Sequence, residues 1–512
     1  MQSANSSPRV RVGPNMLRPA LQAQPRSHRQ PEDALLTGRR PISRLPATVA
    51  RVKTSAMQHP SLVSRRAFLR GTAAASLAAP FAFRAGRAAV SPNGKLQHAC
   101  IGTGGMGVGD LENFRQHPRV EIVALCDVDA NTLKAAAAKL PSARLYRDWR
   151  ELLEQEGDKV DSLNVTVPDH MHFPIAFSAI QRGKHVYVQK PMCHDVAEVR
   201  ALAGAAKAKQ VVTQLGTQLA SMAGDRTTVQ WLREGVIGKV NHLYLSANRP
   251  GAVEAYRPVG PRPAQGQTPP AHLDWNLWLG SAPERPYVPD IYHPVKWRGW
   301  LDFGTGWSGD IGCHIFDAVW KGLGLQPPKS VTARVQASWR DSAARRGDTW
   351  PQANHLTWTF PGNALTGGED LAVEWFDGEF WAPKEIRALY SVEDYPTESA
   401  MVIGEKGALL NPLGSTPMLL PEDRFKDVKR PRFDNRNHYH HFVDAILGGE
   451  KCESHFGQSG PMTEAILLGT VAVRFPGEKL DWDAPALRIA SYPAAERLLR
   501  RQYRKGWEVK GA

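Results

Sequence analysis

Residues 95–216 alternate between short apolar runs and longer stretches of helical character. The runs LQHACIG, VEIVALCD, SLNVTV, HVYVQK and VVTQLG are rich in β-branched residues, and stretches such as ANTLKAAAAKL and DVAEVRALAGAAKAK separate them. Strands that alternate with helices of this length form βαβ units, whose strands lie parallel in one sheet. This alternation predicts an α/β domain with a parallel sheet over residues 95–216.

The first of these runs leads into a glycine-rich turn, IGTGGMG, at residues 101–107. Its glycines are spaced G-x-G-x-x-G between a strand and a helix, and Asp127 ends the next strand twenty residues later. Such glycines allow a tight turn and the close approach of a pyrophosphate to the helix N-terminus, and the carboxylate accepts hydrogen bonds from ribose hydroxyls. The turn therefore predicts a Rossmann domain that binds a dinucleotide, with contacts from Gly102, Thr103, Gly104, Gly105, Met106, Gly107, Asp127 and Val128.

Asp127 also bears on which dinucleotide is bound. Its carboxylate would repel a 2′-phosphate, and the following Val128 and Asp129 supply no arginine to receive one. The sequence favours NAD over NADP.

After residue 216 the pattern changes to strict alternation of apolar and polar residues. Val331, Ala333, Val335, Ala337 and Trp339 alternate with polar neighbours, and HLTWTF repeats the pattern. A strand of this kind has one covered and one open face, and sheets of such strands are usually antiparallel. Residues 217–512 are thus predicted to form an α+β domain, with the Pro- and Gly-rich residues 250–270 as a long loop inside it.

The N-terminal 88 residues differ from the rest of the chain. Residues 64–71, SRRAFLRG, and the weakly apolar run GTAAASLAAPFAF resemble a twin-arginine export signal, with small residues for cleavage near Ala88 or Ala89. Residues 1–56 have the composition of a disordered segment; either Met57 is the true start, or the segment is a long n-region. We expect residues 1–88 to be a disordered leader and signal peptide, the twin-arginine translocation machinery to be a partner, and the protein to be periplasmic or otherwise exported.

Most of the net charge lies in this leader. The 512 residues carry a formal charge of +14, but residues 1–88 hold 15 of the 64 Lys and Arg and 2 of the 50 Asp and Glu. Residues 89–512 carry only +1, which argues against a surface for nucleic acid. No segment approaches the about 20 apolar residues that span a bilayer, so we expect no membrane span in the mature chain. The five scattered cysteines give neither a disulfide framework nor zinc-type spacing.

Motifs of different chemistry follow one another along the chain: GTGGMG, LCDVD, VPDHMHFPIA, GKHVYVQKPM, QLGTQ, GVIGKV and GDIGCHIFD. In order and spacing, over about residues 95 to 490, the chain resembles the glucose–fructose oxidoreductase, inositol dehydrogenase and rhizopine-catabolism family, known as Gfo/Idh/MocA. The resemblance implies a Rossmann domain followed by a domain with a large open sheet, NAD(P) as cofactor, and a sugar, polyol or glycoside as substrate. It also implies a homo-oligomer formed through the open sheet.

In this family the segment that matches VQKP usually reads Glu-Lys-Pro, and its lysine lies near the nicotinamide and the substrate hydroxyl. Lys190 matches that lysine, whereas Gln189 replaces the glutamate and removes a negative charge beside it. The alternative is a surface lysine at a strand end, but strand ends of a doubly wound sheet line the ligand crevice. We expect Gln189 and Lys190 at the cofactor and Lys190 to act in catalysis.

Asp310 and His314, in GDIGCHIFD, are four residues apart and so share one face of a helix. An imidazole beside a carboxylate can accept a hydroxyl proton while hydride leaves the same carbon. Alternatively, Asp310 caps the helix and His314 is a satisfied interior side chain. The match to the family's Asp-x-Gly-x-His motif favours catalysis, with His314 as base, Asp310 orienting its imidazole and Lys190 polarising the hydroxyl.

Further site residues are expected in neighbouring loops. The resemblance places the loop PDHMHFP near the cofactor and substrate, with Pro168 and His172 at the cofactor and His170 at the substrate. Gln218, in QLGTQ, is also expected at the substrate. In the aromatic loop YVPDIYHPVKWRGW, Trp297 and Arg298 are candidates for stacking on a sugar ring, although Trp297 could equally be a core residue.

The run RNHYHHF places His438, His440 and His441 together. No carboxylate or cysteine ligand stands with them in the usual spacing, so we predict no metal site. The segment is expected to begin a helix with partly exposed imidazoles.

Three functions fit these features. The first is an NAD(P)-dependent oxidoreductase that transfers hydride from a hydroxyl of a sugar, polyol or glycoside. The second is a redox-neutral, NAD-dependent glycoside-cleaving enzyme, in which transient oxidation permits elimination. The third is a non-catalytic sugar-binding protein, against which the intact Lys190, Asp310 and His314 argue.

The export signal and the glycine turn explain each other. A dinucleotide is made in the cytoplasm and is scarce outside it, so an exported Rossmann protein must load its cofactor, and hence fold, before it crosses. The sequence therefore predicts tightly bound NAD that is restored within each catalytic cycle.

Overall fold

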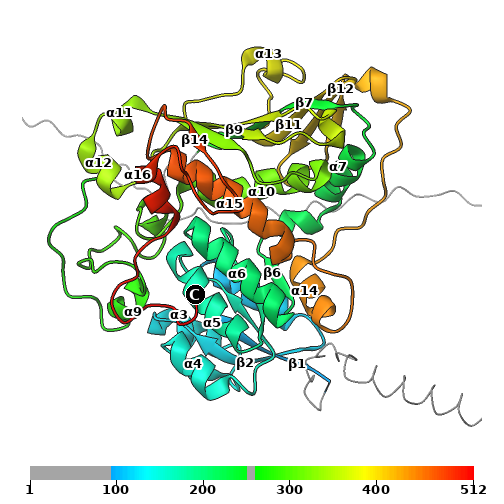
Figure 1. Cartoon of the computed structure of the whole chain (residues 1–512). Helices are drawn as coiled ribbons and strands as arrows, with labels where there is room; N and C mark the ends of the chain where they lie inside the picture. Colours follow the sequence, from blue (N-terminus) through cyan, green and yellow to red (C-terminus); the bar gives the residue numbers. More distant parts are fainter. Residues whose placement is uncertain (1–93, 251–259) are drawn as a thin grey trace, which may run out of the picture. The chain divides into compact units, whose positions relative to one another are not determined.

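The computed structural model describes residues 94–250 and 260–512. The predicted leader and signal peptide, residues 1–88, lie outside the described residues. Two sheets organise the described part of the chain, with strands β1 to β6 in the first and β7 to β14 in the second (Figure 1).

The first sheet has six strands in the order β3-β2-β1-β4-β5-β6. All neighbouring strands are parallel, which confirms the predicted parallel sheet. The order is that of a doubly wound dinucleotide-binding sheet, whose ligand crevice opens where the order reverses, between β1 and β4. The strands are β1 Leu96–Ile101, β2 Val120–Cys126, β3 Arg144–Tyr146, β4 Ser162–Val165, β5 His185–Val188 and β6 Thr213–Leu215.

Three of the helices that connect these strands begin at capping residues. The side chains of Asp129 and Asp148 accept hydrogen bonds from the first turns of α3 and α4, and Asp195 and Glu198 form a capping box on α6. Capping satisfies N–H groups that a helix leaves unpaired at its start. The helices are α2 Met106–Arg115, α3 Ala130–Ala137, α4 Trp149–Glu156, α5 His172–Gln181 and α6 Val196–Lys209.

The second sheet has eight strands in the order β13-β12-β11-β7-β10-β9-β8-β14. Only β7 and β10 pair in parallel; the other neighbours are antiparallel, which confirms the large, mostly antiparallel sheet. The strands are β7 Val240–Ala247, β8 Ser330–Val335, β9 Asn354–Phe360, β10 Leu371–Asp377, β11 Glu398–Gly404, β12 Gly407–Pro412, β13 Met418–Leu420 and β14 Leu480–Asp481.

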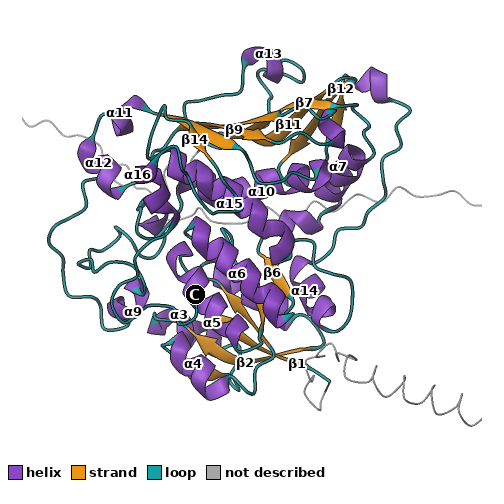
Figure 2. Ribbon diagram, in the orientation of Figure 1, coloured by secondary structure: helices purple, strands orange, loops and turns teal. Residues whose placement is uncertain are grey.

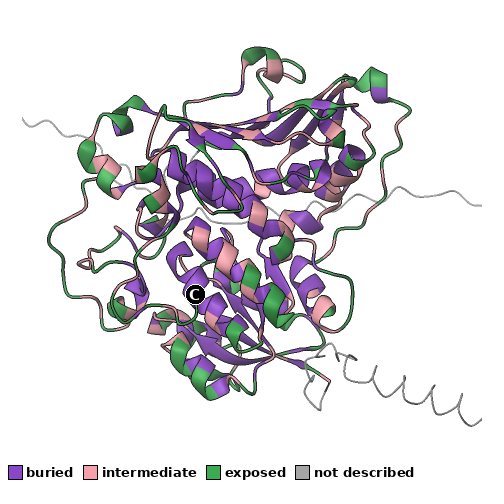
Figure 3. Ribbon diagram, in the orientation of Figure 1, coloured by how far each residue is buried: buried purple, intermediate pink, exposed green. Residues whose placement is uncertain are grey.

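Helices cover one face of this sheet (Figure 2). They are α7 Ala223–Arg233, α10 Gly306–Leu323 and α15 Phe456–Ala472. Along β9 the alternate residues Leu356, Trp358 and Phe360 are at most 2 % exposed, and the ring of Phe316 on α10 lies 6.2 and 6.0 Å from those of Trp358 and Phe360. The strand faces that meet the helices and much of α10 and α15 are buried (Figure 3).

One predicted strand ends earlier than expected. The alternation predicted a strand through Trp339, but β8 ends at Val335 and helix α11 Ala337–Arg340 follows. Trp339 is nevertheless fully buried, and its indole N–H donates to the backbone oxygen of Thr349 at 2.9 Å. Residues 260–270 contain no helix or strand, as expected for that part of the loop.

The other face of the second sheet is only partly covered. The segment 378–397, with α13 Lys384–Arg387, packs Phe380 and Tyr395 near the outward-facing Phe376 of β10. Beside this cover, His242 Nε2 and His355 Nε2 lie 2.7 and 2.6 Å from separate carboxylate oxygens of Glu374. A polar group flanked by apolar residues therefore occupies the open face.

Two late segments return to the first sheet. Helix α14 His438–Ile446 packs on α2, with the rings of Tyr439 and Phe442 5.2 and 6.1 Å from that of Phe114. Near the C-terminus, Arg501 forms ion pairs of 2.9 and 2.8 Å with Asp195 and Glu198, the capping residues of α6. The sequence patterns gave no sign of either contact. The remaining helices are α9 Trp275–Leu279, α12 Ala343–Asp348 and α16 Pro493–Glu496.

Across residues 94–250 and 260–512, no helix has the combined length and apolar character that crossing a bilayer requires.

Candidate functional site

The glycine turn lies at the carboxyl end of β1, where the strand order reverses. Gly102 has a φ of +86°, and a Cβ there would lie 2.0 Å from the backbone oxygen of Thr166 after β4. A Cβ on Gly107 would lie 2.2 Å from the backbone oxygen of Gly102. The start of α2 therefore packs directly on the strand ends. No side chain caps this helix at Gly105, so its N-terminus is open to an anion such as a pyrophosphate.

Asp127, directly after β2, holds the same turn. Its Oδ2 accepts hydrogen bonds from the N–H and the hydroxyl of Thr103 at 2.7 and 3.1 Å, and its Oδ1 accepts one from the N–H of Asp129 at 2.9 Å. The carboxylate is half-buried, and Gly105 and Met106 are exposed beside it. An open helix N-terminus next to a carboxylate fits a dinucleotide; the individual contacts expected of Thr103, Gly104, Met106 and Val128 stay predictions.

Lys190 and Asp310 meet in this region from two different parts of the chain. Lys190 follows the end of β5, Asp310 lies on α10, and Lys190 Nζ is 2.8 Å from Asp310 Oδ1. The lysine side chain is 20 % exposed and the aspartate side chain 9 %. Lys190 is therefore not a free surface lysine but part of an ion pair that solvent still reaches.

His314 lies one turn beyond Asp310 on α10 and is partly exposed. Burial, and then the charge of Lys190, lowers its pKa to about 3, so the imidazole is neutral at neutral pH. Its Nδ1 is buried and makes no hydrogen bond within the described part of the chain. Asp310 pairs with Lys190, and its expected role in orienting this imidazole stays a prediction.

The loop after β4 contacts the loop that carries Lys190. Pro168 precedes the short turn Asp169–Met171. The buried ring of His172 bridges two backbone oxygens, with Nδ1 2.6 Å from that of Pro191 and Nε2 2.8 Å from that of Val167. His172 thus joins this loop to the one that carries Lys190, a role beside the expected cofactor contact.

Asp169 was not singled out in the sequence. It is 2 % exposed, and its Oδ2 accepts hydrogen bonds from the N–H and hydroxyl of Thr305, the residue before α10, at 3.1 and 3.0 Å. Its position just after a strand end was the only available signal, because its partner lies 136 residues away.

Gln189 points to a second carboxylate that sequence reasoning missed. Its side-chain amide donates to both oxygens of Asp110, at 2.9 and 3.0 Å, and the hydroxyls of Thr166 and Tyr439 donate to the same carboxyl group at 2.6 and 2.7 Å. Burial raises the pKa of Asp110. Gln189 thus contacts a buried carboxyl group of α2.

The four expected substrate residues differ in accessibility. His170 is fully buried between Trp278 and Phe303, which corrects the expectation that it contacts substrate. Trp297 is 5 % exposed and belongs to the core, the alternative left open above. The Arg298 guanidinium stacks on its ring at 4.3 Å.

Gln218 is half-buried, and its side-chain amide is hydrogen-bonded to tyrosine hydroxyls. Its amide donates to those of Tyr187 and Tyr439 at 3.3 and 3.1 Å. It therefore belongs to the same buried network as Asp110, and a substrate contact stays a prediction.

The three neighbouring histidines begin α14, as expected, with Asn437 as the cap. His438 and His441 are buried, so the expected partial exposure holds only for His440. His438 lies 2.7 Å from the Ser221 hydroxyl and 2.8 Å from the Leu215 oxygen. Among the described residues, no group of three or more His, Cys, Asp or Glu is arranged to hold a metal ion.

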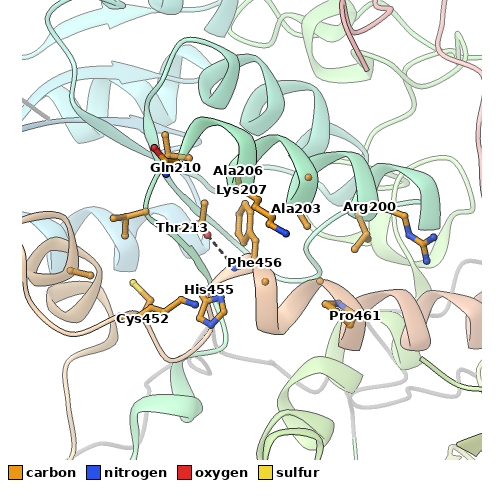
Figure 4. A pocket seen from close by; sticks show the side chains of 18 of the residues that line it. Arg200, Ala203, Ala206, Lys207, Gln210, Thr213, Cys452, His455, Phe456 and Pro461 are labelled. Carbon is orange, nitrogen blue, oxygen red and sulfur yellow. Dashed lines mark hydrogen bonds between the residues drawn. The ribbon is translucent and has the colours of Figure 1, made fainter. Parts of the chain in front are cut away.

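A cavity of about 980 Å³ lies elsewhere, between α6 and the start of α15 (Figure 4). Ala203, Ala206 and Phe456 line it, and the N–H of Phe456 donates to the Thr213 hydroxyl at 3.1 Å along one side. Lys190, Asp310 and His314 are not among its lining residues, so this cavity is distinct from the candidate site.

Two family models match the chain. The model described as "Oxidoreductase family, NAD-binding Rossmann fold" matches residues 96–217, and "Oxidoreductase family, C-terminal alpha/beta domain" matches residues 230–357.

Curated relatives align over less than a third of this chain. A Glycosyl hydrolase family 109 protein of Solibacter usitatus is 30 % identical over 162 residues, 30 % of this chain and 36 % of the relative. The D-apiose dehydrogenase of Paraburkholderia graminis is 29 % identical over 144 residues, 28 % of this chain and 38 % of the relative. The aligned regions thus span little more than a third of these relatives.

Solved structures share the fold over a larger region. The WlbA dehydrogenase from Bordetella pertussis, in complex with NADH and UDP-GlcNAcA, is 18 % identical with a TM-score of 0.50, over 76 % of this chain and 99 % of that one. The aldose-aldose oxidoreductase from Caulobacter crescentus, complexed with glycerol, is also 18 % identical with a TM-score of 0.50, over 76 % and 100 %.

Proposed function

Because the chain carries both domains of the Gfo/Idh/MocA oxidoreductase family, we propose that it is an NAD-dependent oxidoreductase acting on a hydroxyl group of a sugar, polyol or glycoside. The observation that carries this proposal is the Lys190–Asp310 ion pair, at the strand ends that also hold the glycine turn. A charged donor held by a carboxylate at the edge of solvent suits the polarisation of a hydroxyl group.

Separate residues of the site bind the cofactor, polarise the substrate hydroxyl and accept its proton. NAD bound at this site would supply the acceptor for the hydride of the substrate carbon. The glycine turn and the start of α2 bind the pyrophosphate, and Asp127 accepts from the ribose hydroxyls. Lys190 donates to the substrate hydroxyl oxygen, and Asp310 fixes its ammonium group. The neutral imidazole of His314 accepts the hydroxyl proton as general base.

Redox-neutral cleavage of a glycoside is the second candidate. The similarity to a Glycosyl hydrolase family 109 protein supports it. The same residues serve both reactions, since cleavage begins with oxidation of a hydroxyl group and the oxidised intermediate then loses a neighbouring proton and the leaving group.

Export and assembly complete the proposal. The pair Arg65-Arg66 and the apolar run after it support export through the twin-arginine pathway to the periplasm or beyond, with the cofactor bound before export. Scarce NAD outside the cytoplasm favours tight binding and a closed redox cycle. The open face of the second sheet, with its Glu374 cluster, supports a homo-oligomer formed through that face.

Two measurements test the function. Denaturing the purified protein and quantifying released NAD by chromatography should give close to one NAD per chain. Incubation with sugars and aryl glycosides should then give either a keto-sugar or free aglycone. Substoichiometric cofactor, with NADH formed mole for mole with product from added NAD, would leave an ordinary dehydrogenase and remove the closed cycle. Absence of both NAD and turnover would remove the proposed function.

A further inference from the structure

Helix α10 is tied to the first sheet at two points along its length. Asp310 pairs with Lys190 after β5, and Thr305, just before the helix, donates its N–H and hydroxyl to Asp169 Oδ2 after β4. Five residues of helix correspond to about 7.5 Å along its axis. Two contacts at this separation fix both where the helix sits and how it is inclined against the strand ends.

The Asp169 contact joins two segments that lie 136 residues apart in the sequence. The adjacent N–H of His170 donates to the backbone oxygen of Phe303 at 3.2 Å, so the loop after β4 meets the chain before α10 through main chain and side chain together. Thr305 is 1 % exposed and Asp169 2 %. Because water does not compete for these groups, losing the carboxyl group leaves the Thr305 donors buried without a partner.

Charged groups from three neighbouring elements face Asp169. They are Asp310 on α10, Arg298 in the turn before it, and Lys190 and His194 in the segment between β5 and α6. Burial first and the Asp310 carboxylate second raise the pKa of Asp169 to about 7, against the opposing effect of the three cations. Near neutral pH its charge therefore varies beside the Lys190–Asp310 pair.

We propose that Asp169 is a positioning residue of the active site, whose carboxyl group holds the first turn of α10 on the end of β4 and so keeps Asp310 opposite Lys190. The inference rests on the proposed function. Its protonated form keeps the bonds to Thr305 without adding a second negative charge near Lys190. Its ionised form keeps the bonds but competes with Asp310 for the lysine ammonium.

Three variants separate the hydrogen bonds from the charge. D169N keeps an oxygen acceptor for Thr305 and is neutral at every pH. D169A removes the acceptor. D377N is the matched control, because Asp377 is also fully buried with its pKa raised to about 7 by burial, yet its partners are Asn354 and Trp375. Each variant is purified with its bound NAD.

The kinetic readout is the pH profile of kcat between pH 5.5 and 8.5. D377N should keep the wild-type profile, with an inflection near pH 7. D169N should stay within about threefold of wild type at pH 6 and lack that inflection. D169A should lose tenfold or more in kcat throughout, with a smaller change in KM. A D169A enzyme with wild-type kcat, or a D169N profile that keeps the inflection, would overturn the proposal.

A readout without turnover keeps the proposal separate from the proposed function. In protein labelled with ¹⁵N-lysine, the Lys190 side-chain resonance, assigned with K190M, should shift with an apparent midpoint near pH 7 in wild type and D377N but not in D169N. A protein that oxidises no sugar but shows this titration contradicts the function and supports the positioning role. A Lys190 resonance that is the same in D169A and wild type contradicts the positioning role whatever the activity.

Discussion

Lys190 and Asp310 are 120 residues apart in sequence, and their charged atoms are 2.8 Å apart in the structure. The pair joins the end of a strand in the first sheet to a helix that covers the second. A charge-assisted hydrogen bond of this length fixes the direction of the ammonium group. The donor is therefore positioned before any substrate arrives, which lowers the cost of orienting it during the reaction.

K190M should lower kcat by roughly 10²–10³-fold, the scale seen when one electrostatic donor to the reacting oxygen is removed. If Asp310 acts by holding Lys190, D310N should cost less, and the double variant should be no slower than K190M alone. Steady-state kinetics of the four proteins test this. K329M, in the exposed Lys329–Asp370 pair, is a control that should keep wild-type kcat. Multiplying effects would mean that Lys190 and Asp310 act independently.

H314A should slow turnover by roughly 10²–10⁴-fold, the usual contribution of a general base. Bound NAD should be unchanged, because the imidazole acts on the substrate. Single-turnover rates and the NAD content of the purified protein measure the two effects separately. H440A, on the surface of α14, should leave both unchanged. An H314A protein with wild-type rate would reduce His314 to a packing residue.

G107A should destabilise the protein and weaken NAD binding, because a Cβ there meets the Gly102 oxygen at 2.2 Å. G109A lies on the same helix, and a Cβ there meets nothing within 4 Å. It should be neutral or stabilising by about 0.5–1 kcal/mol, the usual gain of alanine over glycine inside a helix. Thermal unfolding and NAD titration of both variants test the comparison. Equal behaviour would show that the close approach is not essential.

E374Q should lower the thermal midpoint near pH 6 and match wild type near pH 2. Hydrogen bonds from His242 and His355 lower the pKa of Glu374 from 4.5 to about 2. A carboxylate whose pKa is lower in the folded state adds stability above its unfolded pKa and loses it as pH falls through the folded value. Unfolding between pH 2 and 7 tests this, with E478Q at an exposed glutamate as control. A constant difference at every pH would exclude this origin.

Replacing Arg65 and Arg66 with lysine should leave folded, NAD-containing protein in the cytoplasm. Fractionation of expressing cells, with NAD measured in each fraction, tests this. Continued export of the lysine variant would mean that another route carries the chain, and the argument for folding before export would be lost.

The first sheet could be predicted because each strand is a short apolar run with helical sequence on both sides. The end of β8 could not. Val335 and Trp339 are four residues apart, a spacing that serves both an alternating strand and one face of a helical turn. Only the folded backbone, with β8 ending at Val335 and α11 beginning at Ala337, shows which one forms.

The site shows a similar division. Gly102, Asp127, Lys190, Asp310 and His314 could be predicted as site residues because motifs carry them. The partners of these residues could not. Asp169 meets Thr305 across 136 residues, and Gln189 meets Asp110 across 79. A local sequence pattern cannot predict contacts between residues this far apart in the chain.

The ion pairs of Arg501 with Asp195 and Glu198 have a consequence for folding during synthesis of the chain. Arg501 binds Glu198 across 303 residues of sequence, and the hydroxyl of Tyr503 donates to the same carboxylate at 2.7 Å. A ribosome adding about 5–20 residues per second needs roughly 15–60 s to cover that distance. During this time α6, which follows the loop of Lys190, has been synthesised but lacks its contacts with Arg501 and Tyr503. A chain truncated before residue 501 would therefore leave Glu198 without its Arg501 and Tyr503 partners, in the domain proposed to bind NAD.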